Sequence, residues 1–273
     1  MKIRANGIVM NYELSGAEDK PALLLGHSLA ATLGMWQPQM PLLEKKFRVL
    51  RYDLRGHGET EATSGAYTLD MLADDAEALL GALSIRSCLY VGLSLGGMIG
   101  QLLALRRAPA LKSIALCATS SRMPQQVGPV WRERIATAES KGMAALVDGT
   151  IDRWFSKRFQ EQHSADVDPV REMIRNTTVA GYTGCCEAIL ALDLTDRLSA
   201  IRLPTLVIVG RDDPGTPLAA SEEIHRRIAG ATLVVLDDAM HFCNIEQAAR
   251  FNEALGTFLD KTAQQLADPA RGG

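Results

Sequence analysis

Short apolar runs alternate with longer stretches of helical periodicity along most of this chain, and this alternation limits its fold more than any other feature. Runs of strand length that are apolar throughout are typical of strands buried on both faces of a parallel sheet. Such runs occupy residues 22–26, 47–53, 87–92, 111–117, 205–210 and 231–236, and helical patterns occupy 68–83, 95–109, 217–230 and 245–261. The repeated order of strand and helix predicts an α/β fold with a mostly parallel central sheet and helices on both faces.

Two segments depart from this alternation. Residues 2–5 and 8–14 flank Asn6 and Gly7, a pair suited to a tight turn, which predicts a hairpin. In residues 121–192 strand signals vanish, and we predict a helical cap inserted after the sixth strand and lying over one edge of the sheet. The core then comprises residues 1–120 and 193–262, while residues 263–273 lack apolar periodicity and are expected to fray.

Charge and cysteine content narrow the classes of partner. The net charge is −3, with no basic stripe, so nucleic acids and anionic membranes are poor partners. No apolar run approaches the length that spans a bilayer. Five cysteines, an odd number, do not resemble a disulfide framework and favour a reducing compartment. We therefore expect a cytoplasmic protein, whose oligomeric state the sequence leaves open.

A sharp turn is predicted at Ser94, where "GLSLG" joins a predicted strand to a predicted helix. In this context the pattern G-x-S-x-G is typical of a strained turn that exposes a nucleophilic serine. Gly92 and Gly96 remove side chains where strand and helix meet, and N–H groups at the helix start favour negative charge. We predict that Ser94 is a nucleophile. A helix-capping serine is the main alternative; a phosphate-binding loop is disfavoured because the G-x-G-x-x-G spacing is missing.

A nucleophilic serine needs a base and an acid that orients the base, in the chain order serine, acid, histidine for such a turn. His241 lies in a loop between the last predicted strand and the final helix, and we predict that it is the base. Asp213 follows the strand at 205–210, and the turn formed by Pro214 and Gly215 can direct its carboxylate back to the sheet. We predict Asp213 as the acid and keep Asp212 as an alternative.

Two backbone N–H groups are predicted to stabilise an oxyanion. One belongs to Leu95, directly after the serine, and the other to Leu29, in the loop after an early strand. His27, in the same loop, is expected to be a structural brace because it precedes the serine. Asp53 is a further alternative acid, but it is better suited to accept hydrogen bonds within its own loop.

Several motifs together resemble the 3-oxoadipate enol-lactonases of the α/β-hydrolase superfamily, from about residue 8 to residue 259. They are "GHSL", "RVLRYDLRGHG", "GLSLGGMIGQ", "RWF", "GYTGCC", "PTLVIVGRDDPGTP" and "NIEQAARFN". The chain departs from the family at Ala30, where glycine is more frequent. The resemblance implies an α/β-hydrolase fold and hydrolysis of 3-oxoadipate enol-lactone to 3-oxoadipate, in the β-ketoadipate pathway of aromatic-compound degradation.

The implied chemistry requires no metal and no organic cofactor, and the usual metal-ligand spacings are missing from the sequence. The same three residues could also serve a carbon–carbon bond hydrolase, a general carboxylesterase or a perhydrolase. A small-molecule receptor that retains the fold is a further alternative. Serine at the turn disfavours dehalogenases and epoxide hydrolases that use an aspartate nucleophile.

The enol-lactone implied by the resemblance carries a carboxylate, yet the cap contains as many acidic as basic side chains. Recognition of this small-molecule lactone therefore requires a placed cation. Trp131 and Arg134 are three residues apart on a predicted helix, so an aromatic wall and a bidentate cation share one face. We predict Arg134 as the carboxylate-binding residue, with Arg132 as the rival and Trp154 as a further wall.

Overall fold

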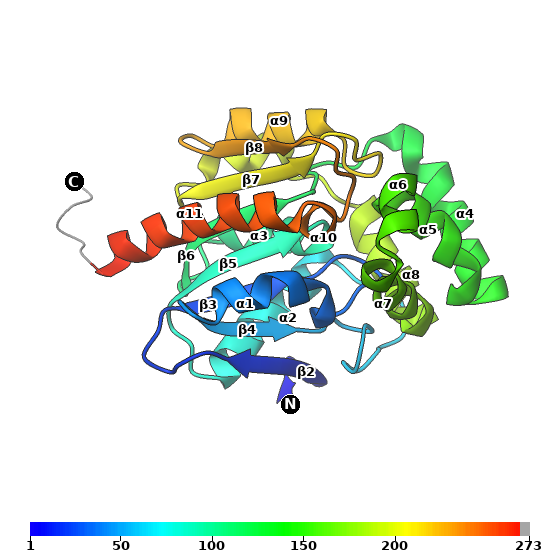
Figure 1. Cartoon of the computed structure of the whole chain (residues 1–273). Coiled ribbons are helices and arrows are strands. Elements are labelled where there is room, and N and C mark those ends of the chain that lie inside the picture. Colours follow the sequence, from blue (N-terminus) through cyan, green and yellow to red (C-terminus); the bar gives the residue numbers. More distant parts are fainter. Residues whose placement is uncertain (268–273) are drawn as a thin grey trace.

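The computed structural model describes residues 1–267, whose strands form one eight-stranded sheet in the order β1-β2-β4-β3-β5-β6-β7-β8 (Figure 1). The strands are β1 (Lys2–Ala5), β2 (Ile8–Ser15), β3 (Ala22–Gly26), β4 (Arg48–Tyr52), β5 (Cys88–Leu93), β6 (Leu111–Cys117), β7 (Thr205–Gly210) and β8 (Thr232–Leu236). β2 pairs antiparallel with both β1 and β4, and all other neighbours are parallel. The predicted α/β fold with a mostly parallel sheet is confirmed.

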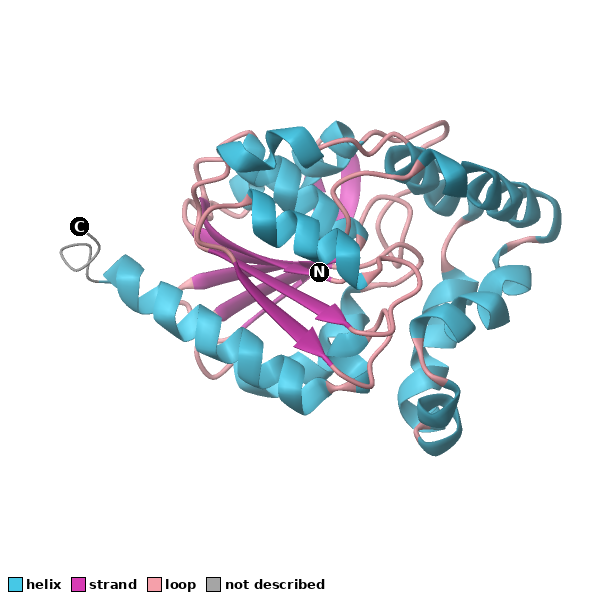
Figure 2. Cartoon of the chain, turned by 90° about the horizontal axis from the view of Figure 1, so that it is seen from above, coloured by secondary structure: helices cyan, strands magenta, loops and turns pink. Residues whose placement is uncertain are grey.

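Helices cover both faces of the sheet (Figure 2). On one side lie α1 (Met40–Leu43) and α11 (Ala248–Ala267); on the other lie α2 (Leu69–Ala82), α3 (Leu95–Leu105) and α9 (Leu218–Arg227). Every residue of β5 and β7 is buried, because neither face of these strands meets solvent. This double burial explains the uninterrupted apolar runs in the sequence. None of the helices in the described chain combines the length and apolarity needed to traverse a bilayer.

The predicted hairpin at the N-terminus is present. Ala5 pairs with Ile8, and the two residues between them, Asn6 and Gly7, have φ angles of 47° and 80°. A two-residue turn with positive φ at both positions matches the right-handed twist of the strands it joins. The Asn-Gly pair adopts this conformation at low cost, so a local signal was sufficient here.

The helical cap predicted after the sixth strand is confirmed. It contains α4 (Gly128–Lys141), α5 (Val147–Trp154), α6 (Lys157–Gln162), α7 (Ser164–Asn176) and α8 (Val179–Leu190), which lie beyond the carboxyl ends of the parallel strands (Figure 1). Short 3-10 helices are η1 (Leu33–Gln39), η2 (Gln125–Val127), η3 (Met143–Leu146) and η4 (Thr195–Ala200). The ends of the cap meet where Arg122 and Asp193 form an isolated bridge.

One sequence prediction near the C-terminus was wrong. Residues 245–261 form no single helix: a short α10 (Cys243–Glu246) ends at Gln247, whose φ of −123° and ψ of 47° interrupt the helix before α11 begins. The helical periodicity is similar on both sides of Gln247, so no local signal marks this break. Of the tail expected to fray, residues 263–267 belong to α11, and residues 268–273 lie outside the described residues.

A contact between two glycines sets how closely the cap approaches the core. A Cβ atom on Gly181, in α8, would lie 2.2 Å from the carbonyl oxygen of Gly56, and one on Gly56 would lie 2.3 Å from the Cα of Gly181. Thr178, the residue before α8, donates from Oγ1 to the same Gly56 oxygen over 2.8 Å. The start of α8 therefore rests directly on the backbone of a core loop.

This contact predicts that Gly181→Ala lowers the free energy of unfolding by roughly 1–3 kcal/mol, because rigid backbone atoms must move apart to accept the methyl group. Gly81→Ala in α2 is the matched control, since a Cβ there meets no atom within 4 Å. The control should raise the free energy by up to about 1 kcal/mol through helix propensity. Urea denaturation measures both, and equal effects of the two substitutions would contradict the assignment.

Candidate active site

Ser94 lies in a tight turn between β5 and α3, with φ 56° and ψ −113°. This backbone conformation is strained for any residue other than glycine. The turn also brings backbone segments into contact: a Cβ on Gly92 would lie 2.3 Å from the carbonyl carbon of Gly96, and one on Gly96 would lie 2.2 Å from the Gly26 oxygen. Glycine is therefore required on both sides of the serine.

Hydrogen bonds hold the backbone of Ser94 while its side chain stays free. The Ser94 N–H donates to the Cys117 oxygen over 2.8 Å, and the Ser94 oxygen accepts from Thr119 Oγ1 over 2.8 Å. The Ser94 side chain makes no capping hydrogen bond to α3. The alternative role as a helix-capping serine thus lacks the contact that defines it.

His241 and Asp213 form a buried pair. His241 Nδ1 lies 2.7 Å from Asp213 Oδ2, and both side chains are almost completely buried. Asp213 Oδ1 accepts from the N–H groups of Gly215 and Thr216 over 2.7 and 3.0 Å, and Thr216 Oγ1 donates to Oδ2 over 2.6 Å. The turn that follows Asp213 therefore fixes the orientation of its carboxylate, and this carboxylate orients the imidazole.

These partners keep Asp213 ionised. Burial opposes the charge, but the charge of His241 and the hydrogen bonds from His241 and Thr216 outweigh it and hold the pKa of Asp213 below its usual value. Asp212, the alternative from the sequence, is exposed to solvent. The structure brings Asp213, and not Asp212, against His241.

The loop that carries His241 is tied to the cap by Glu246, which the sequence analysis missed. One carboxylate oxygen of Glu246 accepts from the Met240 N–H over 2.7 Å, and the other accepts from the Ser156 N–H over 3.0 Å. Ser156 belongs to the joint between α5 and α6, so one buried side chain holds both segments. A carboxylate at the end of a one-turn helix carries no sequence signal for such a bridge.

Aromatic stacking strengthens the same connection. The rings of Trp154 and Phe242 stack with centroids 4.1 Å apart, and the Phe242 N–H donates to the Trp154 oxygen over 3.1 Å. The Trp154 ring also lies 6.1 Å from the imidazole of His241. Trp154, the cap residue predicted to form an apolar wall, therefore lies next to His241, the predicted base.

The backbone N–H groups of Leu29 and Leu95 appear in no hydrogen bond within residues 1–267. Both were predicted as oxyanion donors. Leu95 is the first residue of α3, where a helix leaves its N–H groups unpaired. Ala30, where the resembled family more often has glycine, adopts a left-handed φ of 57°. The loop therefore keeps the conformation that glycine would favour, at some cost in strain.

Two buried histidines brace this loop. His27 Nε2 accepts from the Leu54 N–H over 2.8 Å, and His57 Nε2 accepts from the Ala30 N–H over 3.0 Å. Their Nδ1 atoms then carry the protons and donate to carbonyl oxygens of Ser28 and Arg55. Burial lowers the pKa of His27 to about 4; burial and the neighbouring His27 lower that of His57 to about 3. Both rings act as neutral acceptors, which fits the brace predicted for His27.

Asp53 serves the same region of the core. Its carboxylate accepts from the Leu33 N–H over 2.8 Å and from the Glu59 N–H over 3.1 Å. It also accepts from the side chain of Asn11 over 2.7 Å. These contacts are those of a residue that organises loops, as the sequence predicted.

A cavity of about 70 Å³ lies between the cap and the core residues Ser94, His241 and Leu29. It is enclosed by the core loops and by side chains of α4, α5 and α8. Its lining residues are Ser28, Leu29, Ala30, Ser94, Met98, Met123, Trp131, Arg134, Thr150, Arg153, Trp154, Tyr182, Ile189, Gly215, Thr216 and His241. The cavity thus brings together Ser94, His241 and the three cap residues predicted for substrate binding.

The charges in this cavity are positive. Arg134 lies over the Trp131 ring, 5.1 Å from its centroid, and Arg153 donates from Nη2 to Thr150 Oγ1 over 2.9 Å. Neither arginine forms an ion pair within the described residues, and no carboxylate lines the cavity. Burial, followed by the charge of Arg134, lowers the pKa of Arg153 to about 10, so the Arg153 guanidinium group is still charged at neutral pH.

The rival cation, Arg132, is placed elsewhere. Its exposed side chain pairs with Glu187 and does not line the cavity. Arg153 was missed by the sequence analysis, although it precedes Trp154 in the quoted motif "RWF". Thr150 and Arg153 are three residues apart, and this helical spacing was the available signal that both side chains lie on one face of the helix.

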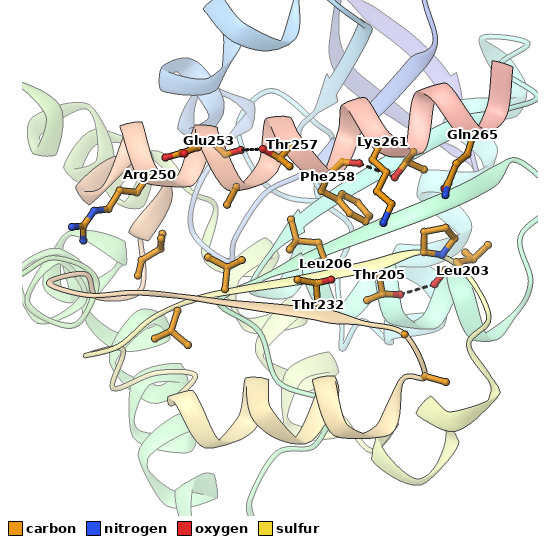
Figure 3. A pocket seen from close by; sticks show the side chains of 18 of the residues that line it. Leu203, Thr205, Leu206, Thr232, Arg250, Glu253, Thr257, Phe258, Lys261 and Gln265 are labelled. Atoms are coloured by element: carbon orange, nitrogen blue, oxygen red, sulfur yellow. Dashed lines mark hydrogen bonds between the residues drawn. The ribbon is translucent and has the colours of Figure 1, made fainter. Parts of the chain in front are cut away.

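A second and larger cavity, of about 880 Å³, lies away from Ser94 and His241, between α11 and strands β7 and β8 (Figure 3). Thr257 and Thr205 on its walls donate to the nearby carbonyl oxygens of Glu253 and Leu203. This groove contains neither Ser94 nor His241. Within residues 1–267, no cluster of three or more His, Cys, Asp or Glu side chains is arranged to hold a metal ion.

Comparison with known proteins places the chain among hydrolases. The sequence model of the alpha/beta hydrolase fold matches residues 21–248. The chain is 32% identical to 3-oxoadipate enol-lactonase 2 of Acinetobacter baylyi, over 93% of this chain and 94% of the relative. The enol-lactonase from Burkholderia xenovorans LB400 superimposes with a TM-score of 0.92 at 38% identity, over 95% of this chain and all of that one. A thermophilic esterase from Thermogutta terrifontis gives 0.89 at 28% identity, over 96% and 98%. The resemblance drawn from the sequence is confirmed.

The two neutral histidines predict how stability depends on pH. Their pKa values in the folded state lie below the unfolded value near 6.5, so the unfolded chain binds more protons between pH 6.5 and about 4. Stability should therefore fall as the pH drops through this window, by up to about 1.4 kcal/mol per pH unit for each histidine. His57→Gln, which keeps an acceptor but cannot titrate, should show a shallower slope in urea denaturation between pH 6.5 and 5. An unchanged slope would mean that His57 is protonated in the folded protein.

Proposed function

The chain belongs to the alpha/beta hydrolase family and is a hydrolase enzyme, and from this premise we propose that it opens 3-oxoadipate enol-lactone to 3-oxoadipate through an acyl-enzyme on Ser94. The observation that carries the proposal is the cavity in which Ser94 and His241 share one space with two arginines that form no ion pair within the described residues. A nucleophile beside a cationic wall suits an ester-like substrate that bears a carboxylate.

The proposed reaction uses the three predicted catalytic residues in turn. His241 takes the proton from the Ser94 hydroxyl as the oxygen attacks the lactone carbonyl, and Asp213 stabilises the imidazolium. The N–H groups of Leu29 and Leu95 hold the negative charge that develops on the carbonyl oxygen. Collapse of this intermediate breaks the ring ester bond, and His241 returns its proton to the enol oxygen that leaves.

Hydrolysis completes the cycle. The released enol relaxes to a ketone while the acyl group remains on Ser94. His241 then removes a proton from water, which attacks the acyl carbonyl, and returns it to the Ser94 oxygen as the acid product leaves. Each step uses groups supplied by the protein, the substrate and water.

Substrate orientation is proposed to come from the cap. Arg134 and Arg153 bind the carboxylate of the lactone, and Trp131 and Trp154 form apolar walls beside the ring. A cavity of about 70 Å³ is small compared with usual ligand pockets of roughly 300–1,000 Å³. The proposal therefore includes an outward shift of α4 and α5 when the substrate enters.

A general carboxylesterase is the second candidate, favoured by the likeness to the Thermogutta terrifontis esterase. The two functions differ in whether the substrate carries an anion that the two arginines can bind. A neutral ester leaves both guanidinium groups without an anionic partner in the cavity, whereas a carboxylate-bearing lactone supplies one. This difference favours the lactone.

We further propose a place for the enzyme in bacterial breakdown of aromatic compounds through the β-ketoadipate pathway, in the cytoplasm. The pathway follows from the proposed substrate. The compartment is supported by the five cysteines, which are all buried and free.

The proposed mechanism predicts a large difference between two neighbouring aspartates. Ser94→Ala should lose about a million-fold in kcat on enol-lactone, and Asp213→Asn roughly 10⁴-fold, because the imidazole loses its orientation. Asp212→Asn is the matched control and should stay within about two-fold, since its side chain is exposed and does not touch His241. Loss of lactone absorbance in steady-state assays measures all three, and a larger effect of Asp212→Asn would reverse the assignment.

The proposed carboxylate site predicts that the effect of a cap substitution depends on the charge of the substrate and not on the size of the side chain removed. Arg134→Ala should lower kcat/KM for enol-lactone about 10- to 100-fold, the usual worth of a hydrogen bond to a charged group, and leave p-nitrophenyl acetate hydrolysis within about two-fold. Arg132→Ala is the control, because this arginine pairs with Glu187 outside the cavity. Equal losses on both substrates would assign Arg134 a structural role instead.

A further inference from the structure

Ser28 carries a buried hydroxyl that the proposed mechanism does not use. The residue is 1% exposed, and its Oγ has no hydrogen-bond partner within the described residues. A buried hydroxyl without a partner destabilises the folded protein, because it loses its hydrogen bonds to water and gains none in return. Such groups are rare in folded proteins, and each one calls for an explanation.

The backbone of Ser28 is held firmly, so its hydroxyl is not free to find a distant partner. The Ser28 N–H donates to Met35 Sδ over 3.3 Å. The Ser28 oxygen accepts from His27 Nδ1 over 2.7 Å and from the Ala31 N–H over 3.2 Å. Both backbone groups are therefore satisfied, and only the side chain is left without a partner.

The position of Ser28 distinguishes it from the other buried polar atoms without partners. Among those atoms in the described residues, only Ser28 Oγ belongs to a residue that lines the cavity with Ser94 and His241. Ser113 and Ser221 also have buried hydroxyls without partners, but they lie in β6 and α9 and do not line this cavity. The missing partner of Ser28 can therefore come from a ligand.

The neighbours of Ser28 indicate which ligand atom this is. Ser28 directly precedes Leu29, whose N–H is also unpaired. The arginines proposed to bind the carboxylate belong to α4 and α5 of the cap, whereas Ser28 belongs to a core loop. Ser28 therefore shares its loop with one of the proposed oxyanion donors and not with the proposed carboxylate site.

We infer that Ser28 is a further catalytic residue, whose Oγ–H donates a hydrogen bond to the substrate carbonyl oxygen as this atom becomes an oxyanion. It acts as a third donor beside the N–H groups of Leu29 and Leu95, and no proton is transferred. The inference rests on the proposed acyl transfer to Ser94. Because the contact strengthens as negative charge develops, it lowers the barrier more than it stabilises the bound substrate.

The test compares Ser28→Ala with Ser113→Ala, which removes an equally buried hydroxyl without a partner from β6. Ser28→Ala should lower kcat on enol-lactone about 100-fold, the usual effect of removing one oxyanion donor, and change KM by less than about three-fold. Ser113→Ala should keep full activity. Both variants should unfold at the same urea concentration as the parent or a higher one, because neither loses a hydrogen bond within the protein.

A second measurement separates this inference from the identity of the substrate. Diethyl p-nitrophenyl phosphate reacts with an activated serine: Ser94 Oγ attacks phosphorus, p-nitrophenolate leaves, and the phosphoryl oxygen takes the oxyanion position. The rate of p-nitrophenolate release should fall at least about ten-fold in Ser28→Ala and stay unchanged in Ser113→Ala. If the parent reacts with this reagent but does not open enol-lactone, the substrate proposal fails while the role of Ser28 is still tested.

Three outcomes would overturn the inference. Unchanged kcat and unchanged phosphorylation in Ser28→Ala would mean that the hydroxyl does not meet the oxyanion. A raised KM with normal kcat would assign it to binding of the ground state. Loss of stability in both Ser28→Ala and Ser28→Cys would mean that the hydroxyl has a partner inside the protein.

Discussion

The close approach of Gly26, Gly92 and Gly96 is the constraint on which the rest of the site depends. Any side chain at Gly92 or Gly96 would collide with backbone atoms, so the end of β5 and the start of α3 can meet only at glycine. This contact forces Ser94 into a strained conformation and places it directly before Leu95, whose N–H at the start of α3 has no partner within residues 1–267. The strain is sustained because β5 and α3 are buried in the core.

The other groups reach Ser94 because parallel strands end at one edge of the sheet. Leu29, Asp213 and His241 follow β3, β7 and β8, in loops at the same edge as the loop after β5. Each loop is then fixed by its own buried polar contacts. Asp213 is held by the turn after it, the loop of Leu29 by two neutral histidines, and the loop of His241 by Glu246.

The cap contributes charge to this edge. Its approach is set by the backbone contact between Gly56 and Gly181, and it brings Arg134 and Arg153 into one small cavity. Two like charges in a buried space repel each other, and this repulsion adds to burial in lowering the pKa of Arg153. A bound anion would relieve the repulsion, which gives a physical reason for the proposed selectivity toward carboxylate-bearing substrates.

The sequence by itself determined those features that depend on neighbours along the chain. Asn6-Gly7 predicted its turn, the glycines around Ser94 predicted a sharp strand-to-helix turn, and Pro214 with Gly215 favoured Asp213 over Asp212. Each of these signals is a backbone preference that operates within a few residues. The order of strands and helices followed from apolar periodicity in the same way.

Only the tertiary structure decided the contacts of Glu246, the placement of Arg153 in the cavity and the burial of the Ser28 hydroxyl. Glu246 accepts a hydrogen bond from Ser156, which is 90 residues away in the chain. The helix is interrupted at Gln247, and apolar periodicity does not mark this interruption. Arg153 differs from Arg132 because packing left it inside the cavity without a carboxylate, while Arg132 met Glu187 at the surface. Ser28 is distinguished because its buried hydroxyl has no hydrogen-bond partner within the described residues. Such properties arise when segments far apart in the chain are packed together, because burial and hydrogen-bond satisfaction are set by the whole fold and not by local sequence.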